Sequence, residues 1–266
     1  MDNETLKNQV KDYWNREACG TFLTDKDKYT REYFEEIEET RYKLQPEIFG
    51  FAQFPRFHGR TVLEIGIGAG TDFIQWTRCG CDSYGIDLTE EAVEHVNRRL
   101  SLYGLNATET RVADAENLPY DDNKFDLVYS WGVIHHSPQT LKALDEIVRV
   151  LKPGGSAKIM VYNRHSLLCY LFWIKHALLK FRPWKPLSWV LWNFMESPGT
   201  KAYTVGEMKK ILGDRNLKNV KVVPLYSYYD KLGRFNWLFK KIAAGLTCIL
   251  GRERIGWFLT FEFTKR

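Results

Sequence analysis

The sequence predicts an α/β fold in which helices cover both faces of a mostly parallel β-sheet. From residue 61 to residue 163, short apolar runs alternate with amphipathic segments of helix length. This alternation is typical of strand–helix–strand units, whose right-handed crossovers make neighbouring strands parallel. A loop with three glycines follows the first apolar run directly, at residues 66–70. Ligands of such sheets bind beyond the carboxyl ends of the strands, so this loop marks the expected site.

Each element is predicted from its periodicity and its end signals. Strands are expected at 61–65, 81–87, 107–115, 124–131, 156–163 and 217–229, with a last strand within 255–266 at the sheet edge. Helices are expected at 3–17, 28–45, 71–79, 89–103, 139–151 and 203–214. Glu90 and Glu91 lie in the first turn of the 89–103 helix, where its dipole favours acids, and Gly104 suits its C-cap. Pro153-Gly154-Gly155 predicts the end of the 139–151 helix.

The composition indicates a globular protein with two differently charged halves. The 266 residues are 44% hydrophobic and 27% charged, enough to bury a sizeable core. Residues 1–146 carry a net charge of −11 and residues 147–266 a net charge of +16, which indicates two kinds of binding surface. The five scattered cysteines and the charged N-terminal segment predict a reduced, cytoplasmic protein. Cys79-Gly80-Cys81 is too tightly spaced for a zinc site, so no metal is expected.

The glycine loop differs from two common nucleotide-binding loops. Its glycines Gly66, Gly68 and Gly70 are followed by Thr71, so the third glycine of the dinucleotide fingerprint is missing. The Gly-Lys-Ser/Thr sequence of phosphate loops is absent as well. Glu64 precedes the loop, and Asp87 and Asp114 end the next two expected strands. Such a carboxylate-rich site disfavours a pyrophosphate and suits a cationic cofactor.

Five ordered motifs, EIGIGAG, GIDLTEEAV, VADAENLPY, FDLVYSWGVIHH and EIVRVLKPGG, resemble those of one enzyme family. Together they are similar to the class I SAM-dependent methyltransferases, especially the methyltransferase-11 branch that includes quinone and small-molecule methylases. The resemblance implies a Rossmann-like three-layer sandwich with a seven-stranded, mostly parallel sheet whose last strand is antiparallel. It also implies S-adenosyl-L-methionine (SAM) as cofactor and S-adenosyl-L-homocysteine (SAH) as product.

The resemblance also assigns roles to single residues. The three loop glycines would wrap the methionine part of SAM, Asp87 would hold the ribose, and Asp114 would accept from the adenine amine. Leu88 would lie beside the adenine, and the backbone of Ala115 would read its edge. The full set of expected cofactor-binding residues is Tyr13, Thr21, Glu64, Gly66, Gly68, Gly70, Asp87, Leu88, Asp114, Ala115, Ser130 and Trp131.

Methyl transfer requires aligned reactants and a base only where the acceptor is a poor nucleophile. His135 and His136 follow the fourth strand and His165 follows the fifth, so all three are candidate bases, with His135 preferred. If His135 is the base, His135→Gln should lower turnover far more than SAM affinity. The fourth strand does not end in Asn/Asp-Pro-Pro-Tyr, which argues against methylation of exocyclic amines on nucleic-acid bases.

Acceptor choice is expected to come from segments added to the core of a single domain. The expected division is a helical cap at 1–59, a SAM-binding core at 60–163, an acceptor lid or insertion at 164–200, and the rest of the sheet at 201–266 with a second insertion at about 231–254. Residues 164–195 hold eight aromatics, five Lys or Arg and no acids. Their apolar stripe at helical spacing comprises Leu167, Leu171, Ile174, Leu178 and Phe181, and residues 237–254 repeat this chemistry.

Several interpretations of this aromatic and basic chemistry stay open. The 164–195 segment suits a lid over its own core, or contact with a hydrophobic acceptor at an anionic membrane surface. RNA binding, with tRNA methylation as function, is an alternative that the mixing of aromatics with aliphatic residues disfavours. The main prediction is a cytoplasmic enzyme, with the inner face of the membrane as an alternative, that methylates a small hydrophobic or lipid-linked acceptor. The alternative from another class is a SAM-binding module without turnover.

Overall fold

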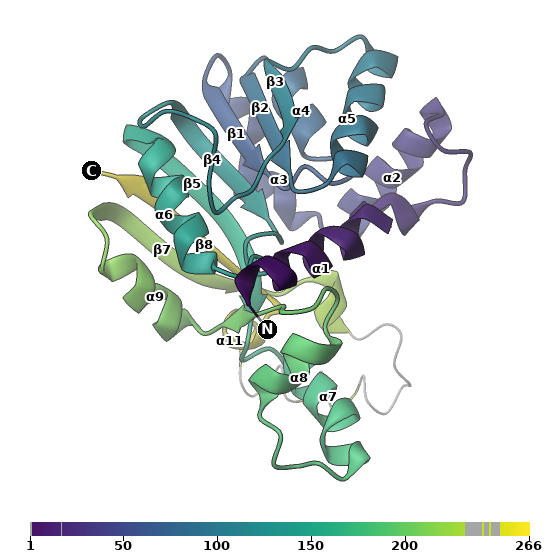
Figure 1. The fold of residues 1–266 in the computed structure, drawn as a ribbon, viewed down its shortest axis with the longest axis vertical. Helices are drawn as coiled ribbons and strands as arrows, with labels where there is room; N and C mark the ends of the chain where they lie inside the picture. Colours follow the sequence, from purple (N-terminus) through teal and green to yellow (C-terminus); the bar gives the residue numbers. More distant parts are fainter. Residues whose placement is uncertain (1, 17, 232–240, 242–244, 246–250) are drawn as a thin grey trace.

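The computed structural model describes residues 2–16, 18–231, 241, 245 and 251–266. Its sheet runs in the order β3-β2-β1-β4-β5-β8-β7, and the short β6 pairs with β5 off this path. The strands are β1 (Thr61–Ile65), β2 (Asp82–Asp87), β3 (Glu109–Val112), β4 (Phe125–Trp131), β5 (Leu151–Asn163), β6 (Ala202–Tyr203), β7 (Leu217–Leu225) and β8 (Phe258–Lys265). The reversal of order at β1 and β4 makes their carboxyl ends the switch point of the sheet (Figure 1).

The predicted antiparallel last strand is confirmed, but its predicted position at the sheet edge is wrong. β8 is antiparallel to both β5 and β7 and lies between them. Phe261 and Leu259 of β8 are buried, as a strand with neighbours on both sides requires. β7 is the edge strand, and its Pro224 is tolerated there because an edge residue needs only one set of ladder hydrogen bonds.

Helices cover both faces of the sheet, which confirms the three-layer α/β architecture (Figure 1). The described α-helices are α1 (Asn3–Arg16), α2 (Arg31–Leu44), α3 (Glu47–Ala52), α4 (Phe73–Arg78), α5 (Glu90–Tyr103), α6 (Thr140–Val150), α7 (Leu167–His176), α8 (Leu187–Phe194), α9 (Val205–Gly213) and α11 (Arg252–Ile255). α6 and α9 pack on one face, through residues such as Leu144 and Met208. α3, α4 and α5 pack on the other face, through residues such as Trp76 and Val96.

End signals in the sequence explain several boundaries. The Thr89 side chain accepts from the Ala92 N–H at the start of α5, and Gly104 ends this helix with φ +61°. α9 begins with a capping box between Thr204 and Glu207. β5 begins at Leu151, five residues before the predicted start, because the chain pairs Leu151 with Phe125 directly after α6.

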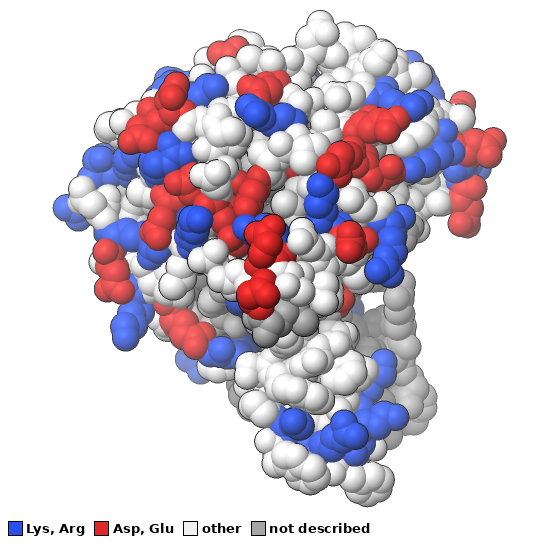
Figure 2. Space-filling model, in the orientation of Figure 1, with Lys and Arg blue, Asp and Glu red and all other residues white. Residues whose placement is uncertain are grey.

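The insertion after β5 forms a separate lobe from α7, a short 3₁₀ turn and α8 (Figure 1). The predicted stripe is wrong beyond its third member, since α7 ends at His176 and the chain passes Phe181 in a left-handed conformation. Figure 2 shows this lobe as white and blue, without red, below an acid-rich body. Within the described ranges, no helix is both long and apolar enough to cross a bilayer. Most of the second expected insertion, 231–254, lies outside the described residues.

Candidate active site

The glycine loop packs so closely that side chains would not fit at its first position. Gly66, Gly68 and Gly70 all have positive φ, at +81°, +47° and +73°. A Cβ on Gly66 would lie 2.2 Å from Cγ2 of Val133. The Cys19 carbonyl accepts from the Ala69 N–H at 3.1 Å, so the segment between α1 and α2 also holds the loop in place.

Asp87 connects the loop to the start of α5. Its Oδ2 accepts from the Gly68 N–H at 3.1 Å, and its Oδ1 accepts from the Thr89 N–H and hydroxyl at 3.0 and 2.8 Å. Burial raises the pKa of Asp87, although these hydrogen bonds oppose the shift. Oδ1 already accepts two hydrogen bonds, so Oδ2 is the oxygen with acceptor capacity left for a ligand hydroxyl.

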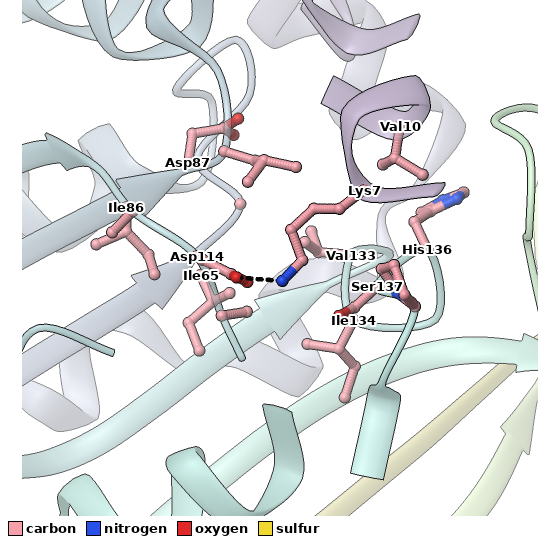
Figure 3. Close-up of a pocket in the computed structure, with 15 residues that line it drawn as sticks. Lys7, Val10, Ile65, Ile86, Asp87, Asp114, Val133, Ile134, His136 and Ser137 are labelled. Atoms are coloured by element: carbon pink, nitrogen blue, oxygen red, sulfur yellow. Dashed lines mark hydrogen bonds and ion pairs between the residues drawn. The ribbon is translucent and has the colours of Figure 1, made fainter. Parts of the chain in front are cut away.

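A pocket at the carboxyl ends of β1, β2 and β4 joins several predicted residues (Figure 3). Its lining is Lys7, Val10, Ile65, Gly66, Ile86, Asp87, Leu88, Ala113, Asp114, Ala115, Val133, Ile134, His136, Ser137 and Pro138. Gly66, Asp87, Leu88, Asp114 and Ala115 were all expected there from the sequence. Lys7 and Val10 were not, because the expected contacts from the N-terminal segment were Tyr13 and Thr21.

Helix α1 crosses this pocket and places Lys7 on the expected adenine-binding carboxylate. The Lys7 ammonium lies 2.6 Å from Asp114 Oδ2 (Figure 3). It also lies 2.8 Å from Glu116 Oε2. Burial alone would lower the pKa of Lys7, but the two carboxylates raise it. The sequence offered a signal for this contact: a lysine in the predicted helix 3–17, and the acids Asp114 and Glu116 at the end of the third expected strand.

The other predicted cofactor residues lie around the pocket rather than in its lining. Tyr13 is on the outer side of α1 against Trp14, and the Thr21 hydroxyl donates to the Ala18 carbonyl. Trp131 donates from Nε1 to Gln45 Oε1 at 2.8 Å. Ser130 is fully buried, and its hydroxyl has no hydrogen-bond partner among the described residues.

Glu64 belongs to a buried polar network beneath the loop. Its Oε2 accepts from Trp76 Nε1 at 2.8 Å. Burial and the neighbouring Asp72 carboxylate raise the pKa of Glu64 well above its ordinary value. Asp72 is held by Arg41 at 3.2 Å and by the Tyr129 hydroxyl at 3.0 Å. This geometry indicates support for the loop from below, while a contact of Glu64 with the cofactor stays a prediction.

The three candidate bases have different environments. His135 is fully buried, and neither ring nitrogen has a partner among the described residues. Burial, then the neighbouring His136 and Lys201, lower its pKa well below the ordinary value, which keeps it neutral. His165 is exposed beyond β5. His136 lines the pocket, so the geometry favours it over His135, the residue preferred from the sequence.

A second polar cluster beside the pocket was missed from the sequence. His136 Nε2 lies 3.4 Å from Oε2 of Glu196, which also accepts from the Tyr162 hydroxyl at 2.8 Å. Tyr229 lies on the same side and accepts from Gln45 Nε2 at 3.2 Å. The available signal was that Glu196 is the first acid after an acid-free run from Ile147 to Met195. No group of residues suited to a metal ion occurs within the described part of the chain.

Comparison with known proteins identifies a domain within the chain. Residues 63–159 match the family described as "Methyltransferase domain". Over these residues the chain carries a methyltransferase domain, and its fold is that of solved SAM-dependent methyltransferases.

The chain has similar relatives among curated proteins and solved structures. It is 37% identical over 99 residues to the phthiotriol/phenolphthiotriol dimycocerosates methyltransferase of Mycobacterium tuberculosis, covering 36% of each chain. It is 23% identical over 222 residues to the demethylmenaquinone methyltransferase of Bacillus mycoides, covering 75% of this chain and 91% of the relative. Geranyl diphosphate C-methyltransferase from Streptomyces coelicolor shares its fold, with a TM-score of 0.65, 15% identity and 98% coverage of both chains. The match thus spans about a third of the mycobacterial relative.

The residues of the pocket fit SAM, the cofactor of the enzymes whose domain the chain matches. Gly66 lines the pocket without a side chain, and Asp87 and Asp114 provide acceptors for hydroxyl and amine donors. Glycine backbone amides suit the cofactor's carboxylate. When bound, SAM supplies a methyl group on a positively charged sulfonium.

Proposed function

We propose that this methyltransferase moves the methyl group of SAM to a small lipophilic acceptor that it meets at an anionic membrane surface. The observation that carries the proposal is the basic, aromatic lobe of residues 164–201, which leaves the sheet at the end of β5 beside the pocket. The names of the relatives above give phthiotriol or phenolphthiotriol dimycocerosates, demethylmenaquinone and geranyl diphosphate as the molecules they methylate. Those names support a lipophilic acceptor for this chain.

The chain's own residues align the reactants and exclude water. The glycine loop, Asp87 and Asp114 would hold SAM, while α1 covers the pocket with Val10 and Lys7. His136 and Tyr162 stand on the acceptor side, at the ends of β4 and β5. A covered pocket strengthens electrostatic interactions and keeps water from competing for the methyl group.

The tip of the lobe supports contact with lipid. Phe181 is 88% exposed, Trp184 72% and Leu179 67%, although residues of these types are usually buried. Lys180 and Arg182 flank them and are exposed. Aromatic and leucine side chains beside basic ones are typical of interfacial membrane segments. Because the lobe lacks acids between residues 164 and 195, its charge complements an anionic surface, at about 1 kcal/mol per basic residue.

Turnover is tested by SAH release. The purified protein is incubated with SAM and a panel of quinols, alkylphenols, isoprenoid alcohols and alkylamines, and SAH is quantified by mass spectrometry. We expect release with at least one lipophilic acceptor and a mass gain of one methyl group on it. Asp87→Asn is the control that should abolish release by weakening SAM binding. SAH binding without release from any acceptor would instead favour a module without turnover.

Membrane contact is tested by co-sedimentation with phosphatidylglycerol and phosphatidylcholine vesicles. Binding should require the anionic lipid, fall with salt, and weaken in a Phe181→Ser/Trp184→Ser variant. Leu141→Ser, which replaces an exposed apolar residue of α6, is the matched control. Protein that stays in the supernatant with anionic vesicles at low salt refutes this part of the proposal. A salt-dependent shift with tRNA in the absence of vesicle binding would favour the RNA alternative.

A further inference from the structure

The cluster around Glu196 has the geometry of a proton-accepting site. The Thr200 hydroxyl donates to the Ser197 carbonyl at 2.6 Å, and its Oγ1 lies 3.0 Å from His136 Nδ1. The Ser197 hydroxyl lies 2.8 Å from the same Nδ1, so two hydroxyls hold the ring on this side. On its other side, His136 Nε2 lies 3.4 Å from Oε2 of Glu196.

Glu196 is accessible to solvent. Its side chain is 39% exposed. Cys19, which lies near it, is exposed as well. Burial raises the pKa of the Cys19 thiol to about 11; Arg41 opposes this, and Glu196 and Asp87 add to it. Cys19 therefore lies near Glu196, and its carbonyl accepts from the Ala69 N–H of the loop on which SAM is expected.

The backbone at Glu196 is held in an uncommon conformation. Its φ is +46°, a left-handed value that costs a non-glycine residue conformational energy. Such positions persist where the surroundings fix them, and here the hydrogen bond from Tyr162 and the contact with His136 do so. Both contacts use Oε2, so Oε1 is available to a ligand.

We propose that Glu196, supported by His136 and Tyr162, accepts the proton of a weakly acidic hydroxyl on the methyl acceptor. This inference rests on the proposed methyl transfer and narrows its acceptor to a hydroxyl such as a phenol or quinol. A bond forms between the hydroxyl oxygen and the methyl carbon, and the bond from that carbon to sulfur breaks, with its electron pair going to sulfur. The hydroxyl proton passes to Glu196 Oε1, so charge and atoms balance.

The charges favour this assignment. The sulfonium loses its positive charge while the carboxylate loses its negative charge, so the step leaves no separated charges behind. A hydroxyl oxygen becomes strongly acidic as it gains the methyl group, so even a weakly basic carboxylate can take its proton. An amine can attack with its own lone pair and lose its proton later, which makes a base less necessary.

The titratable groups facing Glu196 are His136, Tyr162, Tyr229 and Cys19. Burial raises the pKa of Glu196, but the neighbouring His136 ring and the hydrogen bond from Tyr162 outweigh it and lower the pKa. Burial raises the pKa of Tyr162 and of Tyr229, so both stay protonated. Glu196 is therefore ionised at neutral pH and can accept a proton from a bound acceptor.

The test compares two alkylphenols of equal chain length, one weakly acidic and one nitro-substituted and ionised at pH 8. Glu196→Gln preserves the size of the side chain and an acceptor for Tyr162. It should lower kcat for the weakly acidic phenol by about 100-fold or more, while the nitrophenol, which needs no base, stays within about threefold. SAH affinity, measured by calorimetry, should stay within about twofold. Glu109→Gln, a partly exposed carboxylate paired with Arg111 on β3, is the matched control and should change neither rate.

Equal losses for both phenols would show a structural role and overturn the inference, as would no loss for either. A wild-type protein that methylates only acceptors without a hydroxyl also overturns it, while the proposed methyl transfer stands. SAH release from no acceptor refutes the proposed function itself, and the inference with it. The lowered pKa of Glu196 separately predicts that Glu196→Gln costs more stability at pH 7 than at pH 4 in urea unfolding, and an equal cost at both pH values would contradict the lowered pKa.

Discussion

Replacing Gly66 by alanine should damage the loop through two separable effects. At φ +81°, an L-residue pays about 1–2 kcal/mol for the left-handed conformation. The new Cβ would also lie 2.2 and 2.6 Å from the two methyl carbons of Val133. Relieving such overpacking in a core costs a further 1–3 kcal/mol, roughly. Gly66→Ala should therefore lower the free energy of unfolding by about 2–5 kcal/mol.

Gly104→Ala is the control, because Gly104 also has positive φ, +61°, but nothing lies within 4 Å of its added Cβ. This variant should lose only the conformational part, about 1–2 kcal/mol. Urea unfolding monitored by tryptophan fluorescence measures both variants, and the difference between them reports the contact with Val133. In a Gly66→Ala/Val133→Ala double variant, part of that difference should return. Equal losses in the two single variants would refute the reasoning.

Two further predictions concern charged residues near the loop. Lys7→Met should free Asp114 for the adenine amine. SAH binding should become about threefold to tenfold tighter, since a partly exposed ion pair contributes about 1 kcal/mol. Equal or weaker SAH binding in calorimetry would contradict the idea that Lys7 competes with the adenine amine for Asp114. Glu64 has a pKa raised above its value in the unfolded chain, so it costs stability as pH rises from the unfolded pKa towards the folded one. Glu64→Gln should therefore stabilise the protein more at pH 8 than at pH 5 in urea unfolding, and a change that is the same at both pH values would count against a buried carboxylate there.

The central α/β core could be predicted because its signals are local. The 61–65 strand is β1 as predicted, and the acids and Gly104 around α5 are short-range effects of helix ends. The expected edge position of β8 failed because order in a sheet depends on pairing between distant strands. Pro224 in β7 was a local hint that this strand, rather than β8, was at the edge.

The site was less predictable because its residues come from segments far apart in the sequence. The glycines and aspartates follow strand ends and could be placed by pattern. Lys7 reaches Asp114 across 107 positions, and Tyr162 reaches Glu196 across 34. No periodicity encodes such contacts, since they depend on how α1 and the lobe pack against the sheet.

The lobe begins and ends at neighbouring points of the sheet. Tyr162 pairs with Ala202 and Asn163 with Tyr203, so the chain leaves β5 and returns in β6 almost where it left. The length of the lobe can therefore change without altering the strand order, because the β5–β6 pairing fixes both of its ends. Glu196 and Ser197 lie within the lobe and contact His136. Exchanging the lobe between related proteins would therefore replace the proposed acceptor surface and these two partners of His136 together.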